Sequence, residues 1–287
     1  MAGSVGVEGE PVRLRALATA VPSHELEQSA VTSAALGIFE GALENLARLA
    51  PLFAHAGIER RYSCLPIEAH LVERGMGARN QLFIEQATEL LVTATERALD
   101  EAGLAPDVID AVVLVSSTGI ATPSLDALVA ERLGMRPDVE RTPIFGLGCA
   151  GGVLGLARAA DLARVRPGRH VLLLVVELCT LALRLRDKSK ANLVACALFG
   201  DGASAAILST GGEGPWIGVS GEHRWPDTLD VMGWRVEDDG LGVVFSINVP
   251  EIARRRMGEA TADFLLRHGR SGRRSIAGSA ILVGPRS

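Results

Sequence analysis

One cysteine of this chain stands in a setting suited to nucleophilic catalysis. Cys149 lies within the segment from Phe145 to Gly152, where glycines crowd both of its sides. Glycines let the backbone turn tightly and let a substrate approach. A helix is expected to begin here, and its positive end with unpaired amide groups favours a thiolate over a thiol. The segment predicts a cysteine nucleophile, and the alternative is that Cys149 is buried packing, as most unpaired cysteines are.

The elements that must position this cysteine follow from the pattern of apolar residues. Helical patterns alternate with apolar runs, which indicates a sheet with helices packed on it. The runs from Ile109 to Val115 and from His170 to Val176 are almost wholly apolar, so they are predicted as strands inside the sheet. Apolar positions recur at three and four residues from Gln81 to Ala102, which predicts an amphipathic helix that ends at Gly103. The other predicted elements are strands at Arg13 to Val21, Ala203 to Ser209 and Val243 to Val249, and helices at Leu26 to Leu49, Leu125 to Leu133 and Gly148 to Val165.

The composition excludes several classes of protein. With 287 residues, of which 48% are hydrophobic and 22% charged, the chain can bury a substantial core. A net charge of −5 argues against a nucleic-acid partner, which requires basic stripes. No apolar run approaches the roughly twenty residues that span a membrane, and the first residues carry no secretory signal. The four cysteines form no CxxC pair, which favours a reduced compartment over a disulfide framework or a zinc site, so a cytoplasmic protein is expected.

A long, ordered set of motifs resembles one family. The motifs are Ala18 to Pro22, Gly57 to Tyr62, Ser116 to Gly119 with Pro123, the segment around Cys149, Val176 to Cys179, Ala197 to Ala203, and Met232 to Trp234 with Asp239 to Leu241. In this order they resemble the type III polyketide synthases of the chalcone and stilbene synthase family, and they are most similar to its bacterial branch.

The resemblance implies a fold, a domain organisation and an activity. The fold would be a thiolase-like α/β fold, layered α/β/α/β/α, whose second half is incomplete. Residues 1–210 would form the N-terminal half-domain, residues 211–268 the start of the C-terminal half-domain, and residues 269–287 a tail foreign to the family. The activity would be that of an acyltransferase for groups other than aminoacyl, acting in polyketide biosynthesis. An acyl-CoA starter and malonyl-CoA would be joined through a thioester, with coenzyme A thioesters as substrates and no separate cofactor.

The resemblance also assigns roles to single residues. Cys149 would carry the acyl group, and Phe199 would be the aromatic gatekeeper between the coenzyme A tunnel and the reaction cavity. A core phenylalanine is the alternative for Phe199. Thr122 stands where the family often places a methionine that reaches into the partner's cavity of a homodimer. Arg48 and His55 would bind coenzyme A.

The histidine and asparagine that the family uses beyond the cysteine are not found in the family's sequence context. No histidine of the chain is followed by Pro-Gly-Gly. Synthase activity is therefore expected to be impaired in a C-terminally truncated chain. The residues from Ala280 to Ser287 can be encoded so that a shifted frame reads His-Pro-Gly-Gly-Pro-Gln-Val, which leads to the hypothesis of a frameshift between His268 and Ser275. The nucleotide sequence would test it.

Two other functions compete with that of a synthase. The chain could be a non-catalytic partner that dimerises with a complete synthase through the helix after Cys149, because an incomplete sheet leaves an open edge. It could also be a condensing enzyme of fatty-acid initiation, of the ketoacyl synthase type. Phe199 with its following Gly-Asp-Gly and the segment from Met232 to Trp234 favour the polyketide family over this second alternative.

Overall fold

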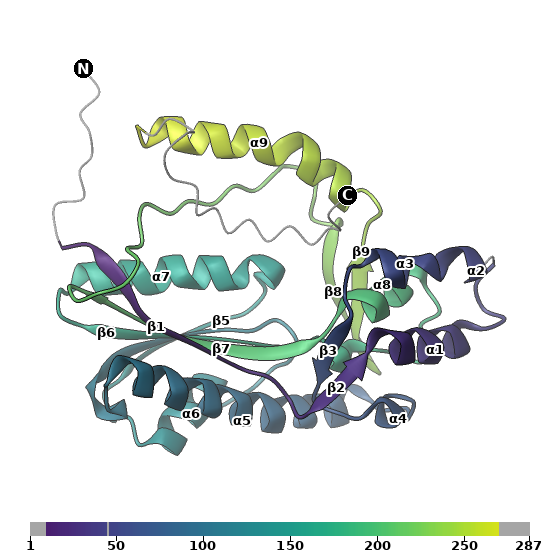
Figure 1. Cartoon of the computed structure of the whole chain (residues 1–287), viewed down its shortest axis with the longest axis horizontal. Coiled ribbons are helices and arrows are strands. Elements are labelled where there is room, and N and C mark those ends of the chain that lie inside the picture. Colours follow the sequence, from purple (N-terminus) through teal and green to yellow (C-terminus); the bar gives the residue numbers. More distant parts are fainter. Residues whose placement is uncertain (1–9, 45, 270–287) are drawn as a thin grey trace.

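The centre of the molecule is a mixed sheet of five strands. A computed structural model describes residues 10–44 and 46–269, and the strand order is β1-β7-β6-β4-β5 (Figure 1). The strands are β1 Val12–Ala20, β4 Ile109–Val115, β5 Glu140–Ile144, β6 His170–Leu178 and β7 Asp201–Thr210. Strand β4 pairs parallel with β5 and β6, whereas β7 is antiparallel to β6 and β1. The two runs predicted as interior strands are β4 and β6, and their position inside the sheet is confirmed.

Helices cover both faces of this sheet. Helices α5 (Met76–Ala102) and α6 (Leu125–Leu133) lie on one face, and α7 (Gly151–Val165) lies on the other (Figure 1). Side chains of β4 alternate between the two cores: Val112 and Leu114 pack with α5, whereas Val113 and Val115 pack with α7. The apolar stripe predicted for α5 is confirmed, and Gly103 ends the helix in the left-handed conformation at φ 64°.

A smaller unit packs beside the sheet around Phe39, Phe53 and Leu193. It contains β2 His24–Glu27, β3 Arg60–Ser63, α1 Gln28–Phe39, α2 Leu46–Leu49, α3 Pro51–His55, α4 Ile67–His70 and α8 Lys190–Leu198. The single helix predicted from Leu26 to Leu49 is wrong, because α1 ends at Phe39. Gly41 then takes a φ of 70°, a left-handed turn that glycine tolerates without strain.

The C-terminal part of the described chain is a hairpin followed by a helix. Strands β8 Met232–Glu237 and β9 Gly240–Phe245 pair with each other, and α9 Val249–Arg267 follows. The strand predicted from Val243 to Val249 is therefore misplaced: β9 ends at Phe245, and Pro250 sits in the first turn of α9, where proline is favoured. The short 3-10 turns are η1 Pro106–Val108, η2 Gly148–Ala150 and η3 Cys179–Ala182.

The described residues form the first three layers of the predicted arrangement. These are α5 with α6, the five-stranded sheet, and α7, and α9 lies farther out on the α7 side (Figure 1). Between residues 10 and 269 the remaining sheets are the two-stranded pairs β2-β3 and β8-β9. Beyond Gly269, the predicted tail and the segment used for the frameshift hypothesis lie outside the described residues. Within those limits, no helix is both long and apolar enough to cross a membrane.

Candidate functional site

Cys149 lies in a tight turn between β5 and α7. Gly146 and Gly148 have φ values of 90° and 54°, which a residue with a Cβ adopts only under strain. The predicted strand-to-helix turn is thus confirmed, although Cys149 lies within η2, which precedes the first residue of α7. All four cysteines are described, and Cys149 is the exposed one. It is the cysteine that an external thioester can reach.

Two further glycines bring α7 against the sheet and so place the turn. A Cβ on Gly151 would lie 2.5 Å from Cγ1 of Val115, and one on Gly155 would lie 2.7 Å from Cγ2 of the same valine. Such distances are shorter than real contacts allow, so only glycine permits this approach. Because Val115 is the last residue of β4, the close packing holds the start of α7 at the carboxyl end of that strand.

Hydrogen bonds tie the turn to the ends of β4 and β6. The backbone N–H of Gly148 donates to Oγ of Ser117 (3.1 Å), just after β4. The N–H of Ser117 donates to the carboxylate of Glu177 on β6, at 2.9 Å to Oε1. The hydroxyl of Thr118 donates to Oε2 of the same carboxylate (2.6 Å). A buried polar network therefore lies directly beneath Cys149.

The electrostatic surroundings of Cys149 oppose the expected thiolate. Burial raises the pKa of the Cys149 thiol, the negative charge of Glu177 raises it further, and a backbone hydrogen bond lowers it. Although the residue is exposed, the protein packed around its sulfur still removes hydration. The net direction is the reverse of the helix-dipole expectation, because burial and the charge of Glu177 outweigh the backbone hydrogen bond, and α7 begins only at Gly151. The described residues therefore favour the thiol over the thiolate at Cys149.

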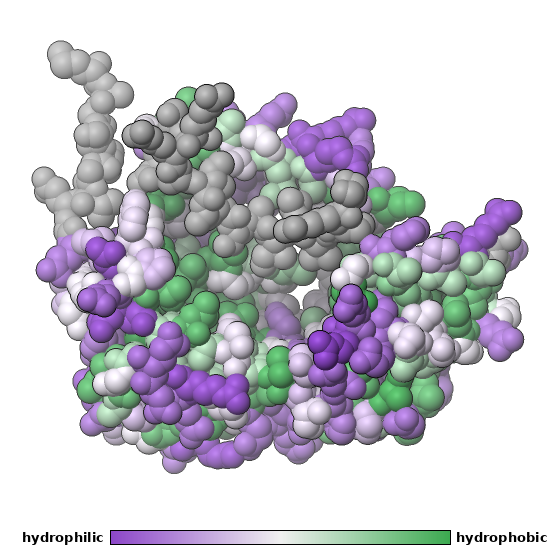
Figure 2. Space-filling view, viewed as in Figure 1, coloured by the Kyte–Doolittle hydropathy of each residue, from purple (hydrophilic) through white to green (hydrophobic). Residues whose placement is uncertain are grey.

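Phe199 follows α8 and lines an apolar cavity of about 70 Å³. Its ring makes an edge contact with Trp234 of β8, with the centroids 5.9 Å apart. The walls of the cavity come from α1, α4 and α8, and Figure 2 shows apolar side chains gathered on the surface over α1 and α4. Cys179 also lines it. Phe199 is therefore a cavity-lining residue with its ring half-buried, rather than a fully enclosed core phenylalanine.

The other three predicted binding residues lie apart from this network. Thr122 is exposed in the loop between β4 and α6, Arg48 is exposed on α2, and His55 is exposed at the end of α3. Among the described residues, no contact joins Arg48 or His55 to Cys149. The binding roles of these two residues therefore stay predictions.

Glu177 and Ser117 were missed as site residues. Their motifs, Ser116 to Gly119 and Val176 to Cys179, carry the family resemblance but point to no role for either residue. A signal was present: both follow runs predicted as neighbouring interior strands, and the carboxyl ends of parallel strands meet at one edge of a sheet. That edge is where an α/β protein places its ligands.

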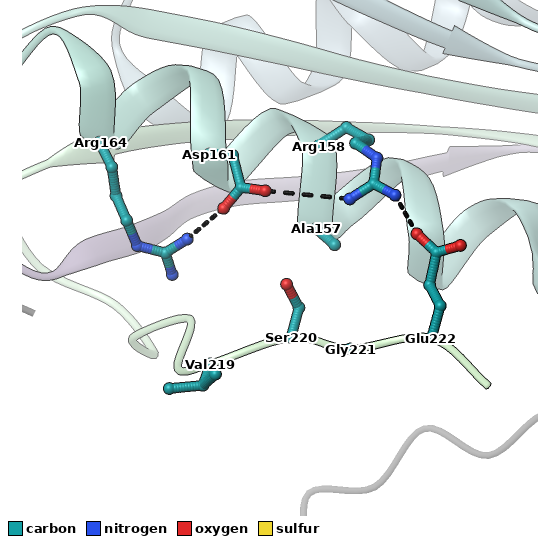
Figure 3. Close-up of a pocket in the computed structure, with 8 residues that line it drawn as sticks. All are labelled: Ala157, Arg158, Asp161, Arg164, Val219, Ser220, Gly221 and Glu222. Atoms are coloured by element: carbon teal, nitrogen blue, oxygen red, sulfur yellow. Dashed lines mark hydrogen bonds and ion pairs between the residues drawn. The ribbon is translucent and has the colours of Figure 1, made fainter. Parts of the chain in front are cut away.

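A larger pocket lies elsewhere on α7, between this helix and Val219 to Glu222, with a volume of about 480 Å³ (Figure 3). Its charges balance within the pocket. Arg164 pairs with Asp161 at 2.7 Å, and Arg158 pairs with Glu222. Such a surface offers little net charge to a ligand. In the part of the chain that the structure describes, no group of three or more His, Cys, Asp or Glu residues could hold a metal ion.

Comparisons with known proteins agree on one family. The model of the chalcone and stilbene synthases, N-terminal domain, matches residues 4–212. The chain is 42% identical to the 1,3,6,8-tetrahydroxynaphthalene synthase of Streptomyces peucetius subsp. caesius over 262 residues, covering 88% of this chain and 69% of that protein. It is 32% identical to a putative chalcone synthase of Bacillus subtilis over 268 residues, covering 88% and 73%. The crystal structure of the Streptomyces coelicolor tetrahydroxynaphthalene synthase, a bacterial type III polyketide synthase, superposes with a TM-score of 0.83 at 27% identity, covering 90% of this chain and 74% of that one. The predicted thiolase-like α/β fold is confirmed.

Proposed function

The chain belongs to the chalcone and stilbene synthase family, and on that premise we propose that Cys149 carries the acyl group in a polyketide-forming transfer. The sulfur attacks the carbonyl carbon of an acyl-CoA, a new thioester bond forms, and coenzyme A leaves as the thiol after taking the proton. Malonyl-CoA then loses carbon dioxide, and the resulting carbon nucleophile attacks the acyl carbon. The carbon–sulfur bond to Cys149 breaks, the sulfur leaves as the thiolate, and the lengthened chain remains on coenzyme A. The observation that carries this proposal is the exposed cysteine in its glycine turn at the carboxyl edge of the sheet.

We also propose roles in substrate binding for Phe199, Arg48 and His55. Phe199 separates the entering thioester from the apolar cavity that would hold the acyl group, which its place on the cavity wall supports. Arg48 and His55 would bind the phosphates of coenzyme A, since both side chains are exposed and carry N–H donors. Coenzyme A thioesters serve as substrates, and no cofactor is proposed.

A homodimer is proposed from the edge of the sheet. Strand β5 pairs with β4 on one side, and among the described strands none pairs with its other edge. An unpaired edge is a template for another chain. Phe145, directly after β5, is 59% exposed and adds apolar surface there. Thr122 would then lie near the contact and reach the partner's cavity. Sedimentation of the chain and of Phe145→Ser tests this, and we expect a dimer that the substitution weakens.

Acylation of Cys149 separates two possible functions, that of a synthase with impaired condensation and that of a non-catalytic partner. Acyl transfer to Cys149 needs the turn described above, whereas condensation also needs the histidine and asparagine of the family, whose sequence context this chain lacks. We propose acylation with impaired condensation. The alternative is a non-catalytic partner of a complete synthase, which the unpaired edge of β5 also favours. Such a partner would not be acylated.

The test is acylation of the intact chain by acetyl-CoA, followed by mass spectrometry at pH 7 and pH 9. We expect one acetyl group at Cys149, formed faster at pH 9 because the thiol is harder to ionise than usual. Cys149→Ala should remove it, and Cys64→Ala is the matched control because Cys64 is buried and lies outside the cavity wall. Acetylation that persists in Cys149→Ala, or that never occurs, would refute the proposal. Adding malonyl-CoA then reports condensation separately.

A further inference from the structure

Glu177 occupies a position that links the ends of two strands to the nucleophile. Val115 and Val175 are register partners in the parallel pair β4-β6, so Glu177 lies two residues beyond that pair. The segment that leaves β4 at Ser116 therefore passes directly in front of its side chain. Three consecutive residues of this segment are almost fully buried, with exposed fractions of 6%, 3% and 8% for Ser116, Ser117 and Thr118.

The carboxylate of Glu177 collects several donors from this segment. The backbone N–H of Ser117 donates to both oxygens, at 2.9 and 3.1 Å. The hydroxyl of Thr118 donates at 2.6 Å and itself accepts the N–H of Leu178 at 2.9 Å. Because an ionised carboxylate can only accept, the hydroxyl supplies the proton of this hydrogen bond. The segment after β4 is thus fixed to β6 through one side chain.

The same segment fixes the turn of the nucleophile. Ser117 uses its N–H toward Glu177 and its Oγ toward the N–H of Gly148. Gly148 precedes Cys149 and has a φ of 54°, in the left-handed region that favours glycine. The chain of contacts therefore runs from Glu177 to Ser117, to Gly148, and to the sulfur-bearing residue.

We propose that Glu177 is a positioning residue for Cys149: its carboxylate holds Ser117, and Ser117 in turn orients the turn of the nucleophile. The inference rests on the proposed function only in taking Cys149 as the nucleophile. Glu177 on β6 and Cys179 on η3 are the groups in the described chain whose charges interact with Cys149. Of these two, the thiol of Cys179 has a pKa raised well above its ordinary value and stays neutral. Glu177 is therefore the carboxylate that acts on the sulfur, while burial raises the pKa of that carboxyl and the hydrogen bonds from Thr118 and Ser117 lower it.

The charge and the hydrogen bonds can be separated by substitution. Glu177→Gln keeps the shape and an oxygen acceptor but removes the charge, so it should favour the thiolate. The fraction of thiolate at a given pH below the pKa should therefore rise, and the alkylation profile should shift to lower pH. Ser117→Ala keeps the charge but removes the acceptor of the Gly148 N–H. It should leave the titration of the thiol in place and slow acylation by about tenfold, as expected for a misplaced nucleophile.

The experiment measures the rate of alkylation of Cys149 by iodoacetamide from pH 6.5 to 10, with the modified peptide quantified by mass spectrometry. This reads the thiol without any acyl-CoA, so a failure here is distinguishable from a failure of the proposed function. Asp110→Asn is the matched control: Asp110 accepts the N–H of His170 (2.9 Å) at the opposite end of β4 and β6. We expect a shift to lower pH in Glu177→Gln and none in the control.

Two results would overturn the inference. A folded Glu177→Gln whose alkylation profile matches that of the wild type would refute the role of the charge. Should that variant not fold, Ser117→Ala still decides the positioning role, because an unchanged rate of acetylation by acetyl-CoA would show that the Ser117 link does not orient the nucleophile.

Discussion

A methyl group added to Gly155 should push α7 away from the sheet and destabilise the protein. The new Cβ would lie 2.7 Å from Cγ2 of Val115 and 2.9 Å from Cδ1 of Leu173. Val115 is 1% exposed on an interior strand, so it has no room to retreat. Overpacking of a core costs about 1–3 kcal/mol, whereas glycine to alanine inside a helix gains up to about 1 kcal/mol. We expect Gly155→Ala to lower the free energy of unfolding by about 1–2 kcal/mol.

Gly152 on the same helix provides the matched control. A Cβ there would meet no heavy atom within 4 Å, so Gly152→Ala keeps only the helix-propensity gain. Urea unfolding monitored by circular dichroism should therefore separate the two variants by about 2 kcal/mol. A second variant tests the cause: Val115→Ala removes both methyl groups that face α7. Combined with Gly155→Ala it should show a favourable coupling of at least about 1 kcal/mol.

Two outcomes would refute this reasoning. If Gly155→Ala were as stable as Gly152→Ala, the close approach of α7 to β4 would not depend on glycine. If Val115→Ala and Gly155→Ala were simply additive, the clash would not involve Val115.

Three further variants test other parts of the structure. Burial lowers the pKa of His70 from 6.5 to about 4, so the stability that its neutral form provides is complete above pH 6.5 and is lost as the pH falls toward 4. Denaturant unfolding should show a loss of up to roughly 3 kcal/mol over this range that is absent in His70→Gln, and equal slopes would contradict the assignment. Asp201→Ala removes the acceptor of the N–H groups of Cys64 and Thr180 (both 2.8 Å) and of the Thr180 hydroxyl (2.6 Å). Since each buried donor left unpaired costs about 1–3 kcal/mol, unfolding should become easier by at least about 3 kcal/mol, and a loss below about 1 kcal/mol would be inconsistent with this network. Phe199→Ala opens the cavity beside Trp234, so acylation by a long-chain acyl-CoA should rise relative to acetyl-CoA; an unchanged ratio would argue against a gatekeeper role.

The elements predicted well from sequence are those whose pattern is set by burial. Strand β4 and helix α6 match their predicted bounds, because a strand covered on both faces and a helix with a single apolar face each leave a distinct periodicity. Strand β5 was not predicted, since an edge strand with Pro143 and mostly exposed side chains shows no alternation. The break between α1 and α2 was missed for a related reason: apolar residues continue across it while Gly41 alone changes the backbone direction.

In the site, the nucleophile is easier to predict than its chemistry. The position of the nucleophile depends on neighbouring residues, whereas its reactivity depends on residues far away along the chain. Glycines beside Cys149 are local, so the turn and the nucleophile could be predicted from one segment. The direction of the thiol pKa depends first on burial of the sulfur and then on the charge of Glu177, which is 28 positions later in the sequence and reaches this edge only because β4, β5 and β6 lie side by side. A helix-end argument counts the nearby amide groups and omits that carboxylate. The pKa of Cys149 shifts in the direction opposite to that expected from a helix end. This indicates that the surroundings at the sheet edge set the reactivity of the sulfur, whereas the glycine turn sets only its exposure.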